Sequence, residues 1–120
     1  MGLAKRGGLA PWQQRRATEM MREKLDGHIH LDDMAEECGL SVSHFTRAFK
    51  TSFGKSPYRW LVECRIDHAK ALLLANDLPI ADIAIRTGFS DQAAFTRAFR
   101  NIVGDSPARW QRALTRSYDS

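Results

Sequence analysis

Residues 45–60 read FTRAFKTSFGKSPYRW, and residues 95–110 read FTRAFRNIVGDSPARW. Ten of the sixteen aligned positions are identical, where chance would supply about one match. A copied segment of this length is usually one supersecondary unit that a chain uses twice. The sequence therefore predicts two sibling units within its 120 residues.

The first copy contains a helix that follows closely on another helix. Phe45, Ala48 and Phe49 recur at three- and four-residue steps, which is the spacing of one helix face. Upstream, residues 31–38 have the same apolar spacing, and Gly39 ends that pattern. Two helices separated by a short turn that contains glycine are the sequence outline of a helix-turn-helix.

The second copy has the same outline. Residues 79–87 form a short predicted helix that Gly88 ends, and Phe95 and Phe99 mark the buried face of the next helix. Each copy contains Ser-Pro near its end, which suits the cap and the first position of a new helix. After the first copy this helix should run to about Asn76, over roughly 27 Å. No stretch alternates with period two for long enough to form a strand.

These patterns predict an all-α protein of about seven helices. Two homeodomain-like three-helix units, each with a helix-turn-helix, are joined by a long linker helix. The predicted parts are a flexible leader at 1–10, a first helix-turn-helix subdomain at 11–56, a connecting helix at 57–76, a second subdomain at 77–114 and a frayed tail at 115–120.

The composition is that of a small globular protein. A chain of this length has room for one ordinary domain or two very small ones. It is 43% hydrophobic and 27% charged, which is typical neither of disordered nor of membrane proteins. No apolar run approaches the roughly 20 residues that span a bilayer, and the N-terminus lacks the apolar stretch of a signal peptide. We therefore expect a cytoplasmic protein without a membrane partner.

Residues suited to metal binding or catalysis are sparse. Cys38 and Cys64 lie in helical patterns without a CxxC spacing, and only His28 and His30 are close together among the histidines. The sequence has no glycine-rich phosphate loop after a strand, no nucleophile elbow and no acid/base pair that spacing brings together. We predict no metal site, no cofactor and no enzymatic activity.

The charge of the chain suggests a polyanionic partner. The net charge is +4, from 18 basic and 14 acidic residues, and thirteen of the basic residues are arginine. Arginine suits bidentate contacts with phosphate and with guanine edges. Acidic residues group elsewhere, as in LDDMAEE at 31–37. This separation favours a nucleic-acid-binding surface.

The second helix of each unit, at about 42–53 and 91–103, has a polar outward face. Its residues follow at three- and four-residue steps, so they share one side of the helix. An α-helix fits the major groove of DNA, where arginine can grip guanine and glutamine can grip adenine. The base-contact candidates are Ser43, Thr46 and Arg47 in the first unit and Gln92, Ala93, Thr96 and Arg97 in the second.

Arg47 and Arg97 are the first candidates for base reading because they occupy the same place in both copies. Each could instead be an ordinary solvated residue or an intramolecular ion-pair partner. The occurrence of both within a duplicated helix-turn-helix favours base reading.

A further set of residues lies near the ends of these helices, where contacts with phosphate would position the protein without specifying sequence. For the charged members, ordinary solvated surface stays open as an alternative. Capping alone would explain both serines, and we attribute Asp91 to the first turn, where the helix dipole favours an acid. The phosphate-contact candidates are Ser41, Lys50, Lys55, Ser90, Arg100 and Arg109.

The chain resembles the DNA-binding domain of AraC/XylS family transcription regulators. The resemblance is carried by GLSVSHFTRAFKTSFGKSPYRW in the first unit and IADIAIRTGFSDQAAFTRAFRNIVGDSPARW in the second, and it covers roughly residues 12–114. It implies that the third and sixth helices enter successive major grooves of double-stranded DNA, and that RNA polymerase is a partner of an activator. One departure is His30, where family members commonly have a serine or threonine cap.

Most members of that family carry a further domain that binds an effector or dimerises. The chain is therefore either a stand-alone regulator, which we slightly favour, or the C-terminal piece of a larger one. Because the helix-turn-helix is duplicated within one chain, we expect a monomer to read an asymmetric site.

Two other functions are open to a duplicated helical protein. A protein-interaction adaptor would expose apolar residues on the faces described above, whereas these faces carry Ser, Thr, Gln, Arg and Lys. A targeting arm for DNA repair or modification would need a catalytic constellation, which the sequence lacks.

Overall fold

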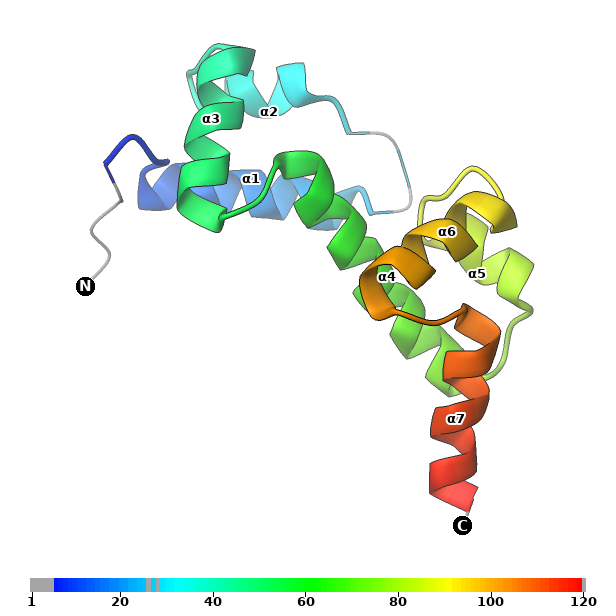
Figure 1. The fold of residues 1–120 in the computed structure, drawn as a ribbon. Helices are drawn as coiled ribbons and strands as arrows, with labels where there is room; N and C mark the ends of the chain where they lie inside the picture. The colour runs from blue at the N-terminus through cyan, green and yellow to red at the C-terminus, as the bar shows by residue number, and fades with distance from the viewer. Residues whose placement is uncertain (1–5, 26, 28, 120) are drawn as a thin grey trace. The chain divides into compact units, whose positions relative to one another are not determined.

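The computed structural model describes residues 6–25, 27 and 29–119, and within this part the regular structure is helical throughout (Figure 1). This confirms the all-α prediction of about seven helices. Residues 1–5 of the predicted leader, and His28, lie outside the described residues. The helices are α1 (Pro11–Glu23), α2 (Leu31–Glu37), α3 (Val42–Phe53), α4 (Pro57–Ala75), α5 (Ile80–Arg86), α6 (Gln92–Val103) and α7 (Pro107–Asp119).

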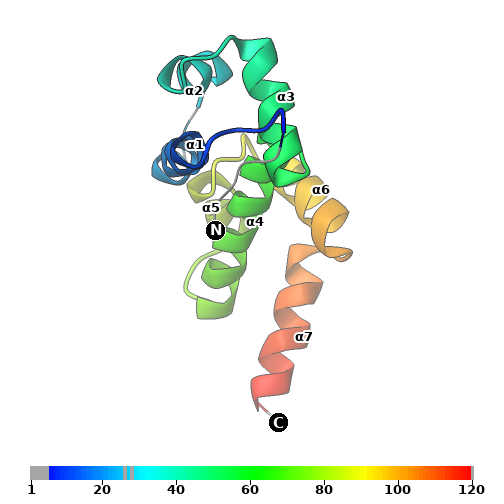
Figure 2. The ribbon, with the colours of Figure 1, turned by 90° about the vertical axis from the view of Figure 1, so that its left-hand side faces the viewer.

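The chain forms two compact units, residues 1–61 and residues 62–120. Leu61 belongs to the core of the first unit and Val62 to the core of the second, so the boundary falls inside α4. The first unit contains α1, α2, α3 and the first residues of α4; Figure 2 looks along α1, with α2 and α3 beside it. The second unit contains the rest of α4 with α5, α6 and α7. The predicted connecting helix at 57–76 is therefore shared between the two cores.

The repeated phenylalanines form the centre of each core. Phe45 and Phe49 of α3 are fully buried, with ring centroids 5.8 Å apart. Phe95 and Phe99 of α6 are equally buried, with centroids 5.7 Å apart. Burying rings of this size contributes strongly to the stability of small units. The phenylalanines are core residues and not an exposed platform for stacking bases.

The repeated tryptophans pack against each core from the helix that follows α3 or α6, namely α4 or α7. Trp60 and Trp110 pack edge-on against the second buried phenylalanine of their unit, at 6.4 and 5.6 Å between ring centroids. A cation of the same unit lies over each indole ring. Arg22 Cζ is 5.7 Å from the ring centroid of Trp60, and Lys70 Nζ is 5.8 Å from that of Trp110. Such contacts add to the apolar packing that holds α4 and α7 in place.

The turn inside each helix-turn-helix begins with the same backbone geometry in both units, although the second turn is one residue longer. Gly39 and Gly88 have φ of +70° and +95°, a region that residues with a Cβ rarely adopt. In both turns the amide after the glycine donates to the carbonyl of a buried alanine near the end of the preceding helix, which is the hydrogen-bonding pattern of a Schellman cap. These hydrogen bonds join Leu40 N to Ala35 O at 2.9 Å and Phe89 N to Ala84 O at 3.0 Å.

Replacing the first turn glycine should destabilise the protein through its backbone. Gly39→Ala is expected to lower the free energy of unfolding by about 1 kcal/mol, because a Cβ disfavours positive φ. The added methyl would meet no atom within 4 Å, so no steric clash contributes. Urea denaturation measures the change. Gly27→Ala is the control, since Gly27 lacks a positive φ and also has open space around it; an equal loss from both variants would contradict the explanation.

The prediction of a flexible leader over residues 1–10 is wrong at Leu9. Leu9 is fully buried in the core of the first unit. Its N–H donates to Ser52 Oγ at 2.8 Å, and its carbonyl accepts from Gln14 Nε2 at 3.0 Å. A single leucine between Gly8 and Ala10 has no periodicity, so nothing local in the sequence marks it as a core residue.

Two helix ends also differ from the sequence-based expectation. Gly27 is the first glycine after the apolar pattern of the first helix and predicts a stop there, but this helix ends at Glu23. The last helix continues to Asp119, past the predicted end at residue 114. No glycine or proline follows that point, so the sequence has no strong stop signal there. None of the helices described is long and apolar enough to span a bilayer.

Candidate nucleic-acid interface

The first candidate reading helix, α3, is capped at both ends. Ser41 is its N-cap and accepts a hydrogen bond from His44 N through Oγ at 3.1 Å, as its sequence position predicts. Gly54 ends the helix in the left-handed conformation, with φ of +76°. Phe45 and Phe49 bury one face against the core, so the opposite face is directed to solvent.

The outward face of α3 is polar and positively charged. Ser43, Arg47 and Lys50 are exposed, and Thr46 is half-buried beside them. Successive steps of three and four residues place these side chains along one side of the helix. All three base-contact candidates of the first unit thus lie on one face, with Lys50 next to them towards the C-terminal end.

The outward face of α6 repeats this arrangement. Gln92, Ala93 and Arg97 are exposed, Thr96 is half-buried, and Arg100 is exposed one turn beyond Arg97. The buried side is again formed by two phenylalanines. The four base-contact candidates of the second unit therefore also share one face.

The two aligned arginines are available for an external partner. Neither Arg47 nor Arg97 forms an ion pair with any residue that the structure describes. Within this part of the chain, the alternative in which both arginines are intramolecular ion-pair partners therefore has no support.

One phosphate-contact candidate has a different structural role from the predicted one. Ser90 is exposed but does not cap α6. The cap is Asp91, whose Oδ1 accepts from Ala94 N at 2.8 Å. The prediction that Ser90 caps this helix, with Asp91 inside the first turn, is therefore wrong by one residue. Serine and aspartate are both good caps, so the choice depends on which side chain reaches the backbone amide.

The basic phosphate-contact candidates differ in their surroundings. Lys50 and Arg100 are exposed, and Lys55 is half-buried. Arg109 is exposed, but its Nε lies 3.6 Å from Asp105 Oδ1. An exposed pair of this kind is weak, so Arg109 can still turn towards another anion.

Two exposed residues of α3 were not among the sequence-based candidates. His44 and Thr51 lie three residues before and four residues after Arg47. These are the steps that place side chains beside one another on a helix, so the same spacing argument could have included them.

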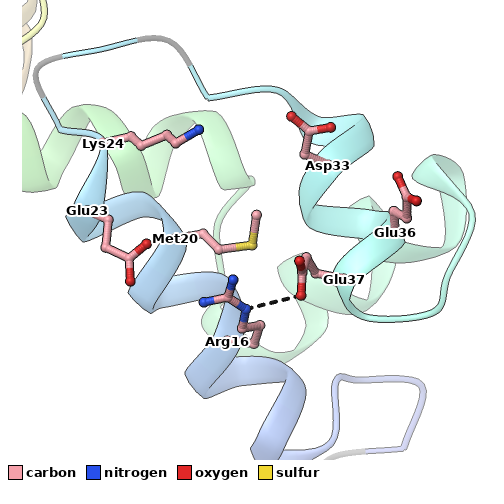
Figure 3. Close-up of a pocket in the computed structure, with 7 residues that line it drawn as sticks. All are labelled: Arg16, Met20, Glu23, Lys24, Asp33, Glu36 and Glu37. Carbon is pink, nitrogen blue, oxygen red and sulfur yellow. Dashed lines mark hydrogen bonds and ion pairs between the residues drawn. The ribbon is translucent and has the colours of Figure 1, made fainter.

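An acidic groove lies between α1 and α2, in contrast to the positively charged faces of α3 and α6. Its volume is about 610 Å³, and Figure 3 shows carboxylates on both of its sides. Arg16 Nε crosses it to Glu37 Oε2 at 3.2 Å, and this hydrogen bond and charge raise the pKa of Arg16. No group of His, Cys, Asp and Glu large enough to hold a metal occurs in the described part of the chain. The lining residues are Arg16, Met20, Glu23, Lys24, Asp33, Glu36 and Glu37.

His30 occupies the position where the resemblance anticipates a serine or threonine cap. It is the N-cap of α2, and its side chain makes no capping hydrogen bond. Asp32 and Asp33 lie in the first turn, where acidic side chains interact favourably with the helix dipole. The departure thus affects one helix start and leaves the outward faces of α3 and α6 unchanged.

Two helix-turn-helix units with polar, arginine-bearing second helices define the class of this protein. A family profile described as a helix-turn-helix domain matches residues 34–113, from within α2 to within α7. The chain belongs to this family, whose members of the AraC type regulate transcription.

Curated relatives match the chain over part of its length. It is 41% identical over 63 residues to the HTH-type transcriptional regulator ExsA of Pseudomonas aeruginosa, covering 52% of this chain and 23% of that protein. It is 36% identical over 80 residues to the virulence regulon transcriptional activator VirF of Yersinia enterocolitica, covering 67% of this chain and 30% of that one. The chain thus spans less than a third of either relative.

Solved structures match the fold more completely. An AraC-type transcriptional regulator from Chromobacterium violaceum superposes with a TM-score of 0.76 at 29% identity, covering 84% of this chain and 89% of that one. The DNA-binding domain of AdpA, solved in complex with a target DNA, gives a TM-score of 0.76 at 27% identity, covering 84% and 90%.

Proposed function

We propose that this chain binds double-stranded DNA sequence-specifically and regulates transcription, with α3 and α6 reading two successive major grooves. The observation that carries this proposal is the pair of exposed arginines, Arg47 and Arg97, at the same place on the two helices. The base contacts are assigned to Ser43, Thr46 and Arg47 of α3 and to Gln92, Ala93, Thr96 and Arg97 of α6. Ala93 offers only an apolar contact, such as one with a thymine methyl group.

Phosphate contacts are assigned to residues that flank the base-reading positions. They would fix the register of each helix on the duplex without reading sequence. Ser41 and Ser90 can donate through their hydroxyl groups, and the remaining members are cations. The assigned residues are Ser41, Lys50, Lys55, Ser90, Arg100 and Arg109.

The proposal is tested by selection from a random duplex pool with the purified chain at near-physiological salt. An asymmetric motif with two information-rich boxes about one helical turn apart is the expected result. Enrichment of no motif, with only salt-sensitive binding to bulk DNA, would contradict sequence-specific reading by this chain. Sedimentation of the complex with the selected duplex tests the expected stoichiometry of one chain per site.

Removing a phosphate contact should weaken binding to every sequence alike. Lys50→Ala is expected to lower affinity uniformly and to reduce the slope of log K against log salt by about one, because one fewer counterion is released. Fluorescence anisotropy across a salt series measures both quantities. Lys24→Ala, which removes an exposed lysine from the end of α1, is the control; the same slope change in both variants would contradict a contact at Lys50.

We also propose that the chain acts in the cytoplasm as an activator and contacts RNA polymerase, and that it has no catalytic activity. The description of VirF as a transcriptional activator supports activation. Transcription in vitro from a template that carries the selected site tests this proposal. Addition of the chain should raise the yield of transcript with purified polymerase, and a fall in transcript would indicate a repressor.

The adaptor alternative has one observation in its favour. A mainly apolar groove of about 300 Å³ lies beside Leu31 and Tyr58, which are exposed. Among the described residues, Val42 is the exposed large apolar side chain on α3, and α6 has none. The faces that the adaptor reading requires to be apolar are therefore polar, which favours DNA binding.

A further inference from the structure

The surroundings of the two candidate reading helices differ in charge at aligned positions. From the caps of α3 and α6 onward, the repeat pairs each residue of the first unit with the residue fifty positions later. Around α3 the charged and capping positions carry four positive charges and no negative one, and around α6 they carry three positive and two negative charges. The aligned sets are Ser41, Arg47, Lys50, Lys55 and Arg59 in the first unit and Asp91, Arg97, Arg100, Asp105 and Arg109 in the second.

The first difference lies at the start of the helices. The free amides at a helix N-terminus favour an anion, so this end of a reading helix suits a DNA phosphate. At α3 the cap is the neutral Ser41. At α6 the exposed carboxylate of Asp91 is held there by its 2.8 Å hydrogen bond from Ala94 N. The N-terminus of α6 therefore already has an anion of its own, which repels an approaching phosphate.

The second difference lies just beyond the end of the helices. Asp105 occupies the place that Lys55 has in the first unit. Its Oδ1 accepts from Ser106 N at 2.8 Å and lies 3.6 Å from Arg109 Nε. The positive charge of Arg109, which flanks α6, is thus partly neutralised by Asp105. At the position of this acid the first unit has the cation Lys55.

We propose that Asp91 and Asp105 lower the sequence-independent attraction of the second unit for DNA. On this inference α6 gains its binding energy mainly from base contacts, and α3 supplies most of the salt-dependent attraction. Specificity is a difference between affinities, so weakening the attraction that all duplexes share raises discrimination between sequences. The inference rests on the proposed function, in which both helices contact DNA.

The test is the double variant Asp91→Asn/Asp105→Asn. Asparagine retains the side-chain oxygen that each aspartate uses, and it is as good an N-cap as aspartate. The variant is expected to bind a random duplex on the order of tenfold more tightly at low salt, with a salt slope steeper by about one. Its affinity for the selected site should rise less, so the ratio of specific to random affinity falls.

Two further variants separate a local effect from one of net charge. Glu23→Gln/Glu36→Gln also removes two negative charges, from α1 and α2, neither of which has a proposed DNA contact. It should leave the affinity ratio close to that of the unaltered chain. Ser41→Asp adds the carboxylate to α3, where it can still cap, and should lower random-duplex affinity about threefold.

The outcomes distinguish this inference from the proposed function. Equal effects of the two double variants would overturn the inference, because net charge alone would then explain them. The inference also fails if Arg97→Ala weakens specific binding while Asp91→Asn/Asp105→Asn changes nothing. If Arg97→Ala leaves binding to every duplex unchanged, α6 does not touch DNA and the proposed function itself fails for the second unit.

Discussion

Arg47→Ala and Arg97→Ala are each expected to weaken binding to the selected site by about 1 to 3 kcal/mol and to relax specificity at different ends of it. Both arginines are exposed on a face whose opposite side is buried, so their removal leaves the core intact. A bidentate contact with one base pair discriminates against the other pairs at that position. Anisotropy titrations with single-substituted duplexes give the loss at each base pair.

The pattern of the loss is the informative quantity. A base reader loses affinity for the selected site and tolerates substitutions at one position, whereas a phosphate contact loses affinity equally for all sequences. An equal loss would therefore show that the arginine contacts the backbone. Arg15→Ala is the control, because Arg15 is exposed on α1 and has no proposed DNA contact. Circular dichroism of each variant verifies that its helical content is unchanged.

Phe99→Ala is expected to lower the free energy of unfolding by about 3 to 5 kcal/mol, which is enough to unfold a small unit with a single core. Phe99 is fully buried in the second unit and lies 5.7 Å from Phe95 and 5.6 Å from Trp110, measured between ring centroids. Its loss removes these contacts and leaves a cavity. Urea denaturation followed by tryptophan fluorescence measures the change.

The duplicated architecture offers a matched pair for this experiment. Phe49→Ala removes the aligned phenylalanine from the first unit and should have an effect of similar size. Tyr58→Ala is the control for loss of an aromatic ring, because Tyr58 is 72% exposed. A loss for Phe99→Ala as small as that for Tyr58→Ala would contradict the assignment of Phe99 to the core.

The sequence was sufficient to locate the elements of the candidate interface. Apolar residues at three- and four-residue spacing identified the buried faces of α3 and α6, and so also their outward faces. The repeat showed which residues of the two units correspond, including Arg47 and Arg97. These inferences succeed because amphipathic spacing and glycine turns act within one or two helical turns.

Features that depend on contacts between distant segments needed the structure. Leu9 is buried among core residues from distant parts of the first unit, and its N–H donates to Ser52 Oγ, 43 residues away. The division of α4 between Leu61 and Val62 depends on which core each side chain meets. The cap of α6 is instead a local feature: Ser90 and Asp91 are both good caps, and the structure shows that the Asp91 carboxylate reaches Ala94 N.

The amino-acid sequence by itself therefore determined the helical class, the duplication and the polar faces, because each follows from local spacing and composition. Tertiary structure alone decided where one core ends and the next begins and which leader residue is buried. Those features depend on distances between side chains and backbone groups that only the folded chain brings together.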